Sequence, residues 1–343
     1  MQKNKSLGII SIITQPLLNN YGGLLQNYAV QKVLLKLNEK SVTIDILDRQ
    51  IPFWIYIFSW IKSFLLLFIF GKKRGFAKIK KRRVRKIWAN DFVSANIKTT
   101  KLCKSYKRKF LQRYDSNVVI VGSDQVWRPK YNPRIEDMFL NFAKNDSIKR
   151  IAYAASFGVD YWEYSPKQTR VCSALAKKFD AISVREESGV KLCKEHLGVD
   201  ATWVLDPTLL LKKEDYLPIC KNIPVCTEKY LAVYVLDENE QVMVTYEKEA
   251  VARGLVVKKF HVDSNATLTI PEWLAMFRDA SYVVTDSFHG TVFSIIFGKE
   301  FKCIYNQGRG AARFESLMNL YNSGKLEEMR EKSLNWLKNA LET

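Results

Sequence analysis

The sequence predicts an α/β fold built from two units, each with a doubly wound parallel sheet. Short apolar strands alternate with amphipathic helices, which is typical of parallel sheets covered by helices. The alternation breaks at residues 217–228, which contain Pro218 and Pro224 and have no clear periodicity. A chain of 343 residues is also long for one compact domain. We therefore expect an N-terminal domain over residues 1–216 and a C-terminal domain over residues 228–343.

The N-terminal domain begins with a short apolar run. We expect a strand over Ile9–Thr14, a loop through Asn20-Tyr21-Gly22-Gly23, a helix over Leu24–Leu37 and a strand over Val42–Leu47. Four further short apolar runs predict strands over residues 118–121, 151–155, 181–184 and 203–205. Helices over residues 169–179 and 188–197 fit between the later strands.

The C-terminal domain repeats the alternation. Strands are expected over residues 230–236, 256–261, 282–285 and 301–305. Helices are expected over residues 240–253 and 271–278, and a third begins near Phe288 or His289. Two charged helices, at about Ala312–Leu320 and Leu326–Leu341, close the chain.

An insertion at about residues 50–112 interrupts the N-terminal domain. Its apolar run Phe53–Phe70 is broken only by Ser59, Lys62 and Ser63. As a helix it would be roughly 27 Å long, short of the roughly 30 Å hydrocarbon core of a bilayer. Lys62 near its middle would cost about 2.5–3.5 kcal/mol if the helix spanned a membrane.

The positive charge of the chain is concentrated beside this apolar run. Of the net charge of +19, the segment Lys72–Lys109 carries +15, from sixteen Lys or Arg and one acid, Asp91. An apolar helix followed by basic residues suits a helix lying on an anionic membrane surface. The alternatives are a helical hairpin packed on the protein, followed by a solvated basic helix, and a true span. We expect no nucleic-acid partner, because no recognised motif accompanies the basic run.

Cysteine usage and the N-terminus predict a cytoplasmic protein. The insertion adds the expectation that it is peripheral at the inner face of the cytoplasmic membrane. The six cysteines are scattered, without a CxxC pair or zinc spacing, so reduced thiols and no metal are expected. The apolar run Leu7–Ile13 after Lys3 and Lys5 is short and lacks a cleavage site, which favours a strand over a signal peptide.

Polar and glycine residues recur just after the predicted strands. In open parallel sheets, ligands bind beyond the carboxyl ends of the strands, so these positions are the candidate site. They are residues 20–23, 122–127, 156–158, 185–187, 206–208 and 285–290.

His289 is the first candidate for chemistry. It sits at a predicted helix N-terminus, where free backbone N–H groups favour an anion, and it could act as general acid or base at neutral pH. The alternative is a histidine that simply caps the helix. The other two histidines, His196 and His261, are expected to be structural.

Arginines are the candidates for holding an anion. Arg185 directly follows a strand, where a guanidinium suits a carboxylate or a phosphate. The alternative is a salt bridge to Glu186, Glu187 or another neighbour. Arg309 and Arg313 flank a glycine-rich turn before a helix and leave the same two possibilities open.

Asp124 and Trp127 could form a sugar-binding pair, with a carboxylate for hydroxyls and an aromatic face for stacking. The alternative is a capping aspartate and a core tryptophan. Gly22-Gly23 lacks the full GxGxxG pattern, so a dinucleotide site has weak support.

Taken together, these segments resemble the polysaccharide pyruvyl transferase family. The likeness runs from about residue 8 to 320 and is interrupted at residues 50–110. The matching segments are Asn20-Tyr21-Gly22-Gly23-Leu24-Leu25-Gln26, Gly122-Ser123-Asp124-Gln125-Val126-Trp127, Ala155-Ser156-Phe157-Gly158, Ser183-Val184-Arg185-Glu186, Leu205-Asp206-Pro207-Thr208 and Thr285-Asp286-Ser287-Phe288-His289-Gly290.

The resemblance implies a GT-B-like fold with a cleft between two Rossmann-like domains, the first facing the acceptor and the second the donor. It also implies transfer of pyruvate from phosphoenolpyruvate, a co-substrate with no further cofactor, to two hydroxyls of a sugar. The product is a cyclic ketal in a surface polysaccharide, such as a capsule or exopolysaccharide, or in its lipid-linked precursor.

The resemblance also implies site residues. Arg185 and His289 match positions that contact phosphoenolpyruvate. The remaining donor-side positions are Ser287, Phe288, Gly290, Arg309 and Arg313, and the acceptor-side positions are Asn20, Tyr21, Gly22, Gly23, Gln26, Asp124, Gln125 and Trp127. Some members carry an arginine where this chain has Ser287, and Arg309 or Arg313 could supply that cation.

Two other functions remain open at this point. A GT-B glycosyltransferase would use a nucleotide sugar, with Arg309 and Arg313 on its diphosphate. A non-catalytic, membrane-associated assembly protein would not need His289.

Overall fold

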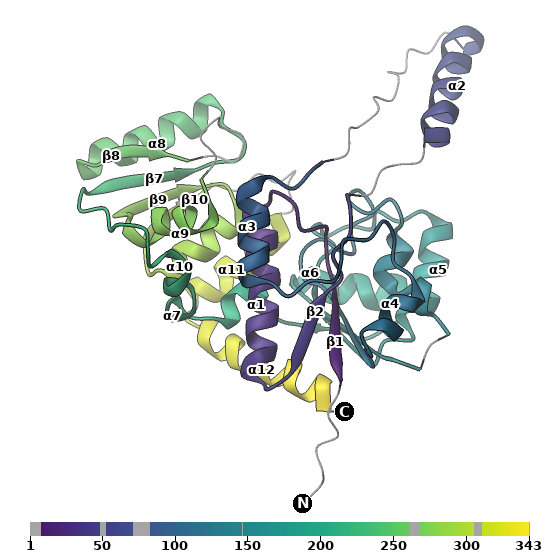
Figure 1. Cartoon of the computed structure of the whole chain (residues 1–343). Helices are drawn as coiled ribbons and strands as arrows, with labels where there is room; N and C mark the ends of the chain where they lie inside the picture. The colour runs from purple at the N-terminus through teal and green to yellow at the C-terminus, as the bar shows by residue number, and fades with distance from the viewer. Residues whose placement is uncertain are drawn as a thin grey trace, which may run out of the picture.

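Two all-parallel sheets organise the chain (Figure 1). The computed structural model describes residues 8–48, 53–70, 83–145, 147–260, 268–304 and 311–342. The first sheet has the strand order β2-β1-β3-β4-β5-β6 and the second has the order β10-β9-β7-β8. In each sheet the first strand along the chain lies between the second and the third, which is the 2-1-3-4 order of one common class of doubly wound sheet. The predicted α/β fold with two such units is confirmed.

Among the described residues, the first unit contains six strands and seven of the α-helices. The strands are β1 Ile9–Ile13, β2 Lys40–Thr43, β3 Val118–Val121, β4 Lys149–Ala155, β5 Ala181–Val184 and β6 Thr202–Trp203. Its helices are α1 Tyr21–Lys36, α2 Phe53–Phe70, α3 Ile87–Asn96, α4 Arg108–Arg113, α5 Pro166–Ala176, α6 Glu187–Leu192 and α7 Lys213–Tyr216. All four side chains of β3 are buried, as expected for an apolar strand covered on both faces.

In the part of the second unit that the structure describes there are four strands. They are β7 Tyr230–Tyr234, β8 Val256–Lys259, β9 Tyr282–Thr285 and β10 Glu300–Cys303. The helices are α8 Glu240–Arg253, α9 Ile270–Asp279, α10 Phe288–Ile296, α11 Ala311–Asn322 and α12 Leu326–Glu342. The predictions for β3, β5, β9, α2 and α8 agree with the structure at both ends.

Helix α1 begins earlier than the sequence predicted. The expected loop through Gly23 is wrong, because Asn20 is already the N-cap and its Oδ1 accepts a hydrogen bond from Gly23 N at 3.2 Å. Such a cap satisfies a backbone donor in the first turn, so the helix can start at Tyr21. Gly22 and Gly23 are therefore helical.

The last two helices return to the first unit, although the expected boundaries grouped them with the second. In α12, Ser333 Oγ accepts a hydrogen bond from Leu205 N at 2.9 Å, and Leu341 O accepts one from Lys149 Nζ at 2.8 Å. In α11, Ser316 Oγ lies 3.4 Å from Glu187 N at the start of α6. The end of the chain thus ties the second unit to the first.

The described part of the insertion contains helices α2 and α3 and most of α4, joined by irregular segments. Helix α2 stands apart from the body of the molecule (Figure 1). The basic helix expected after it falls largely on residues 71–82, outside the described residues. Among the described helices, none has both the length and the apolar character needed to cross a membrane.

Candidate active site

The carboxylate of Asp206 joins elements from both units. Its Oδ2 accepts hydrogen bonds from Gln26 Nε2 of α1 at 2.5 Å and from Arg185 Nη1, just after β5, at 2.9 Å. Its Oδ1 accepts from the backbone N of Thr208 at 3.0 Å and from the Thr208 hydroxyl at 2.6 Å. Nε2 of His289, on α10 of the second unit, lies 3.9 Å from Oδ2. Gln26, Arg185 and His289 therefore converge on one carboxylate at the junction of the units.

Asp206 is buried, yet its surroundings favour the charged form. Burial raises the pKa of this carboxyl, but the neighbouring His289 and Arg185 and the hydrogen bonds from Thr208 and Arg185 hold it below its usual value. Asp206 is thus a carboxylate at neutral pH. The sequence placed Asp206 in a matching segment but gave it no role, because three of its four partners come from other segments of the chain.

His289 does not cap its helix. The cap of α10 is Ser287, whose Oγ accepts a hydrogen bond from Gly290 N at 3.3 Å. The Ser287 backbone N in turn donates to Thr285 Oγ1 at 3.1 Å. The imidazole of His289 is therefore released from capping and turns toward the first unit.

The surroundings of His289 keep it neutral. Its side chain is 12% exposed, and burial lowers its pKa to about 4. Asp206 opposes this shift, whereas Arg185 and Arg313 add to it. Nε2 is buried and makes no hydrogen bond within the described part of the chain. At neutral pH the ring is an imidazole with base character.

Arg185 pairs with aspartates rather than with its neighbours in sequence. Besides Asp206, its Nη2 lies 3.8 Å from Asp124 Oδ1. The adjacent Glu186 instead accepts hydrogen bonds at Oε1 from the backbone of Phe157 and Gly158 and from the Ser156 hydroxyl. Nε and Nη2 of Arg185 are buried and make no hydrogen bond to the described residues. Two charged donors therefore remain available to a ligand.

A second cation shares an aromatic neighbour with Arg185. The Phe288 ring centroid lies 5.0 Å from the guanidinium carbon of Arg185 and 5.3 Å from that of Arg313, on α11. Burial, followed by the charge of Arg185, lowers the pKa of Arg313 to about 10, so it remains protonated at neutral pH. A cavity of about 10 Å³, with room for about one water, is bounded in part by these three residues and Asp206. Arg309 lies outside the described residues.

Other predicted positions shape the backbone around this cluster. A Cβ at Gly290 would lie 2.2 Å from Thr285 Oγ1, so α10 can approach β9 only with glycine there. The hydroxyl of Tyr21 donates to Leu268 O of the second unit at 2.5 Å. A Cβ at Gly23 would lie 3.7 Å from Asp124 Oδ2, which places Asp124 close to the first turn of α1.

The side chains of Gln125 and Trp127 make their contacts away from Arg185, Asp206 and His289. The indole of Trp127 is 0% exposed, stacks on Phe139 at 4.8 Å and donates to Met138 O at 3.2 Å. Gln125 Oε1 accepts a hydrogen bond from Arg128 Nη1 at 3.0 Å. The sugar-stacking role expected for Trp127 is therefore corrected, since the residue belongs to the core.

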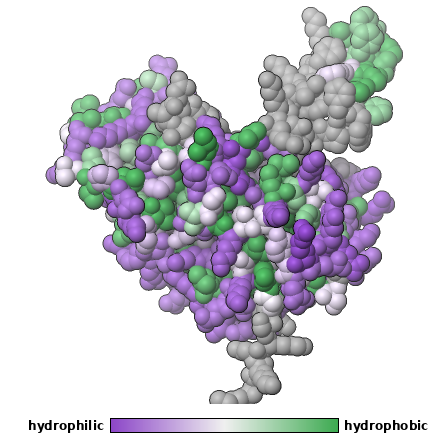
Figure 2. Space-filling view, viewed as in Figure 1, coloured by the Kyte–Doolittle hydropathy of each residue, from purple (hydrophilic) through white to green (hydrophobic). Residues whose placement is uncertain are grey.

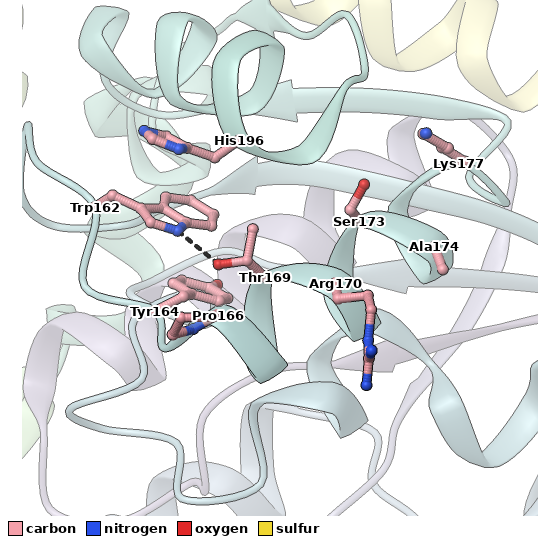
Figure 3. A pocket seen from close by; sticks show the side chains of 9 residues that line it. All are labelled: Trp162, Tyr164, Pro166, Thr169, Arg170, Ser173, Ala174, Lys177 and His196. Carbon is pink, nitrogen blue, oxygen red and sulfur yellow. Dashed lines mark hydrogen bonds between the residues drawn. The ribbon is translucent and has the colours of Figure 1, made fainter.

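A larger open cavity, of about 800 Å³, lies along α5 and contains none of the predicted site residues (Figure 3). At one end, Trp162 is stacked between Tyr164 at 4.2 Å and His196 at 4.4 Å. The Trp162 indole N–H donates to Thr169 Oγ1 at 2.8 Å. The faces of the tryptophan are thus already occupied, and His196 is part of this stack.

Solved structures with a similar course of the chain include epimerases and a polymerase. UDP-GlcNAc 2-epimerase from Neisseria meningitidis, bound to UDP-GlcNAc, is 11% identical, with 98% of this chain and 97% of that chain covered and a TM-score of 0.49. MnaA from S. aureus with UDP is 9% identical, with 95% and 91% covered and a TM-score of 0.47. The wall teichoic acid polymerase TagF is 9% identical, with 98% and 83% covered and a TM-score of 0.42. These values concern the course of the chain and carry no conclusion about ligands.

Sequence comparison is more specific. No curated protein sequence matches this chain. The family model described as polysaccharide pyruvyl transferase matches residues 20–308, which include Gln26, Arg185, Asp206 and His289. Because that match covers most of the chain, the protein belongs to the polysaccharide pyruvyl transferase family.

Proposed function

We propose that the chain transfers pyruvate from phosphoenolpyruvate to two hydroxyls of one sugar, forming a cyclic ketal and releasing phosphate. The sugar would belong to a surface polysaccharide or to its lipid-linked precursor. The observation that carries the proposal is the convergence of Arg185 and His289 on Asp206. It places a guanidinium and a neutral imidazole side by side where the two units meet.

The cations suit the donor. Phosphoenolpyruvate carries a carboxylate and a phosphate, both of which accept hydrogen bonds from guanidinium groups. Arg185 has two buried donors without a hydrogen bond among the described residues, and Arg313 lies near the same phenyl ring. Arg313 can therefore take the place of the arginine that some family members carry at the position of Ser287.

The reaction needs protons moved at three points. The methylene carbon C3 of the donor accepts a proton, which leaves cationic character at C2. The first sugar hydroxyl forms a C–O bond to C2 and loses its proton. The C–O bond to phosphate then breaks, and the second hydroxyl attacks C2 and loses its proton. One proton is thus taken up by carbon and two are released from hydroxyls, one of which balances the phosphate.

His289 is the proposed acid and base. Arg185 and Arg313 help to depress its pKa, so an anionic donor bound to both cations would raise that pKa again. A protonated His289 could then supply C3, and the neutral ring could afterwards accept a hydroxyl proton. Asp206 would stabilise the imidazolium between these steps.

Donor binding also requires space. The cavity at Arg185 and Arg313 holds about one water, which is less than phosphoenolpyruvate occupies. We therefore expect the two units to separate at the junction for donor entry and to close again around the bound donor.

Thermal unfolding with candidate donors tests the proposal. Phosphoenolpyruvate at about 100 times its Kd should stabilise the wild type by about 2.7 kcal/mol. In Arg185→Lys, which keeps the charge beside Asp206 but loses the guanidinium donors, that stabilisation should shrink. Stabilisation by a nucleotide sugar and none by phosphoenolpyruvate would overturn the proposal in favour of glycosyl transfer.

A further inference from the structure

Helix α2 carries a stripe of exposed apolar side chains. Ile57, Ile61, Phe64, Leu65 and Phe68 follow one another at the spacing of one helical face. Their exposed fractions run from 39% for Ile57 to 69% for Phe68. Figure 2 shows α2 as an apolar patch at the top right, standing off from the body. Contiguous apolar surface of this kind marks an interaction site.

The charge around the stripe points to the kind of partner. Phe53–Phe70 contains no acidic residue and one cation, the exposed Lys62. Seven of the next twelve residues, 71–82, are Lys or Arg and none is acidic. A long lysine side chain can keep its ammonium in water while its stem lies along apolar groups. An apolar helix beside clustered cations matches the chemistry of a bilayer surface with anionic headgroups.

We propose that α2 docks in the interfacial layer of a membrane that contains anionic lipid. We take the helix to lie along the surface, since its roughly 27 Å falls short of the roughly 30 Å hydrocarbon core and Lys62 near its middle would be costly there. The apolar stripe enters the boundary between headgroups and acyl chains, and the positive charge of the adjoining sequence favours anionic headgroups.

The base of the insertion is bonded to the loop that precedes α1. Arg85, which follows α2 within the insertion, pairs at 2.5 Å with Asp45, which precedes the insertion, and its Nε donates to Leu17 O. Asn19 donates from Nδ2 to Val84 O at 2.9 Å and accepts at Oδ1 from Lys86 N at 2.7 Å. The next residue along the chain is the N-cap of α1, the helix that carries Gly22 and Gln26.

Docking of α2 would therefore hold the acceptor side of the candidate site near the bilayer. This consequence rests on the proposed function, because it matters only if the acceptor sugar is attached to a lipid. The docking itself does not depend on the reaction.

Flotation of the full-length protein with vesicles tests the docking. We expect it to float with vesicles of phosphatidylcholine and phosphatidylglycerol, and much less with phosphatidylcholine alone. Phe64→Glu with Phe68→Glu should lower binding by at least about tenfold, because it places two charges in the stripe. The matched control is Val244→Glu with Val251→Glu, two exposed apolar positions on α8, which should float like the wild type.

Three outcomes would overturn the docking. They are flotation of the α2 variant at the wild-type level, no flotation of the wild type with anionic vesicles, and a change of oligomeric state in the α2 variant without vesicle binding by the wild type. The last would mean that α2 contacts a second copy of the chain. Stabilisation by phosphoenolpyruvate should be the same in all three proteins, which separates a failure of the docking from a failure of the proposed function.

Discussion

The imidazole of His289 lies directly against the backbone of Gly22. A Cβ at Gly22 would be 2.0 Å from Nδ1 of His289, far closer than two such atoms can approach. Helix α1 of the first unit and helix α10 of the second thus meet through a glycine and a histidine ring. The next residue differs, because a Cβ at Gly23 would be 3.6 Å from its nearest neighbour, Asn20 Cγ.

This contact predicts that Gly22→Ala displaces His289. We expect transferase activity to fall by about a hundredfold, since a shift of about 1 Å in a catalytic group has that effect. The free energy of unfolding should fall by about 1–3 kcal/mol as the junction is overpacked. Gly23→Ala, one residue away on the same helix, is the comparison: its Cβ would make only ordinary contacts, so it should leave His289 in place and lose less activity than Gly22→Ala. Equal activity of the two variants would show that the ring moves without consequence.

The burial of His289 predicts a specific dependence of stability on pH. An unfolded histidine takes up its proton near its ordinary pKa of 6.5, whereas folded His289 does so at about 4. The unfolded chain therefore binds more protons between these values. The free energy of unfolding should fall as pH drops from about 6.5 to about 4, by about 3 kcal/mol at most. Above pH 6.5, His289 should add no pH dependence to it.

Chemical unfolding of wild type and His289→Asn across this pH range isolates that effect. The variant lacks the titrating group, so its stability relative to the wild type should rise as pH falls. A difference that stays constant with pH would contradict a depressed pKa for His289.

Replacing Asp206 with asparagine should lower the free energy of unfolding by a large amount, although the substitution is small. Asp206→Asn would leave the buried guanidinium of Arg185 without its closest counter-ion, at a cost of about 3–5 kcal/mol. It would also lower the pKa of His289 further, because Asp206 raises it. The first effect is measured by chemical unfolding and the second by NMR titration of the histidine ring. Glu300→Gln, which removes an exposed partner of Arg253, is the control and should cost about 0–1 kcal/mol.

The sequence predicts the alternation of strands and helices because hydrophobic periodicity is local. It also predicts the helix Phe53–Phe70 at both ends. It cannot show that Asp206 gathers Gln26, Arg185 and Thr208, since Gln26 is 180 residues away along the chain. Such a convergence depends on how two strand ends and two helices meet in space.

Trp127 is a second residue whose environment the sequence does not determine. A tryptophan just after a strand can face either a ligand or the core, and the spacing of residues 122–127 fits both. Its stacking on Phe139 and its hydrogen bond to Met138 decide for the core. The sequence likewise does not predict that α12 contacts the first unit, because an amphipathic helix does not specify which sheet it covers.

We predict that the ring of Phe288 supports donor binding without touching the reacting atoms. Its centroid lies near the guanidinium groups of Arg185 and Arg313, and each such contact is worth about 0.5–2 kcal/mol. Phe288→Leu keeps the position apolar but removes the ring face that attracts the cations. We expect Kd for phosphoenolpyruvate, measured by calorimetry, to rise by about tenfold.

The control is Phe314→Leu, which removes a ring whose centroid lies 5.8 Å from the guanidinium carbon of Arg313. If the ring orders both cations for the donor, Phe288→Leu should weaken donor binding more than Phe314→Leu at a similar loss of stability. Equal effects on Kd would mean that the phenyl ring of Phe288 contributes packing alone, and that Arg185 is positioned by Asp206 without help from the second unit.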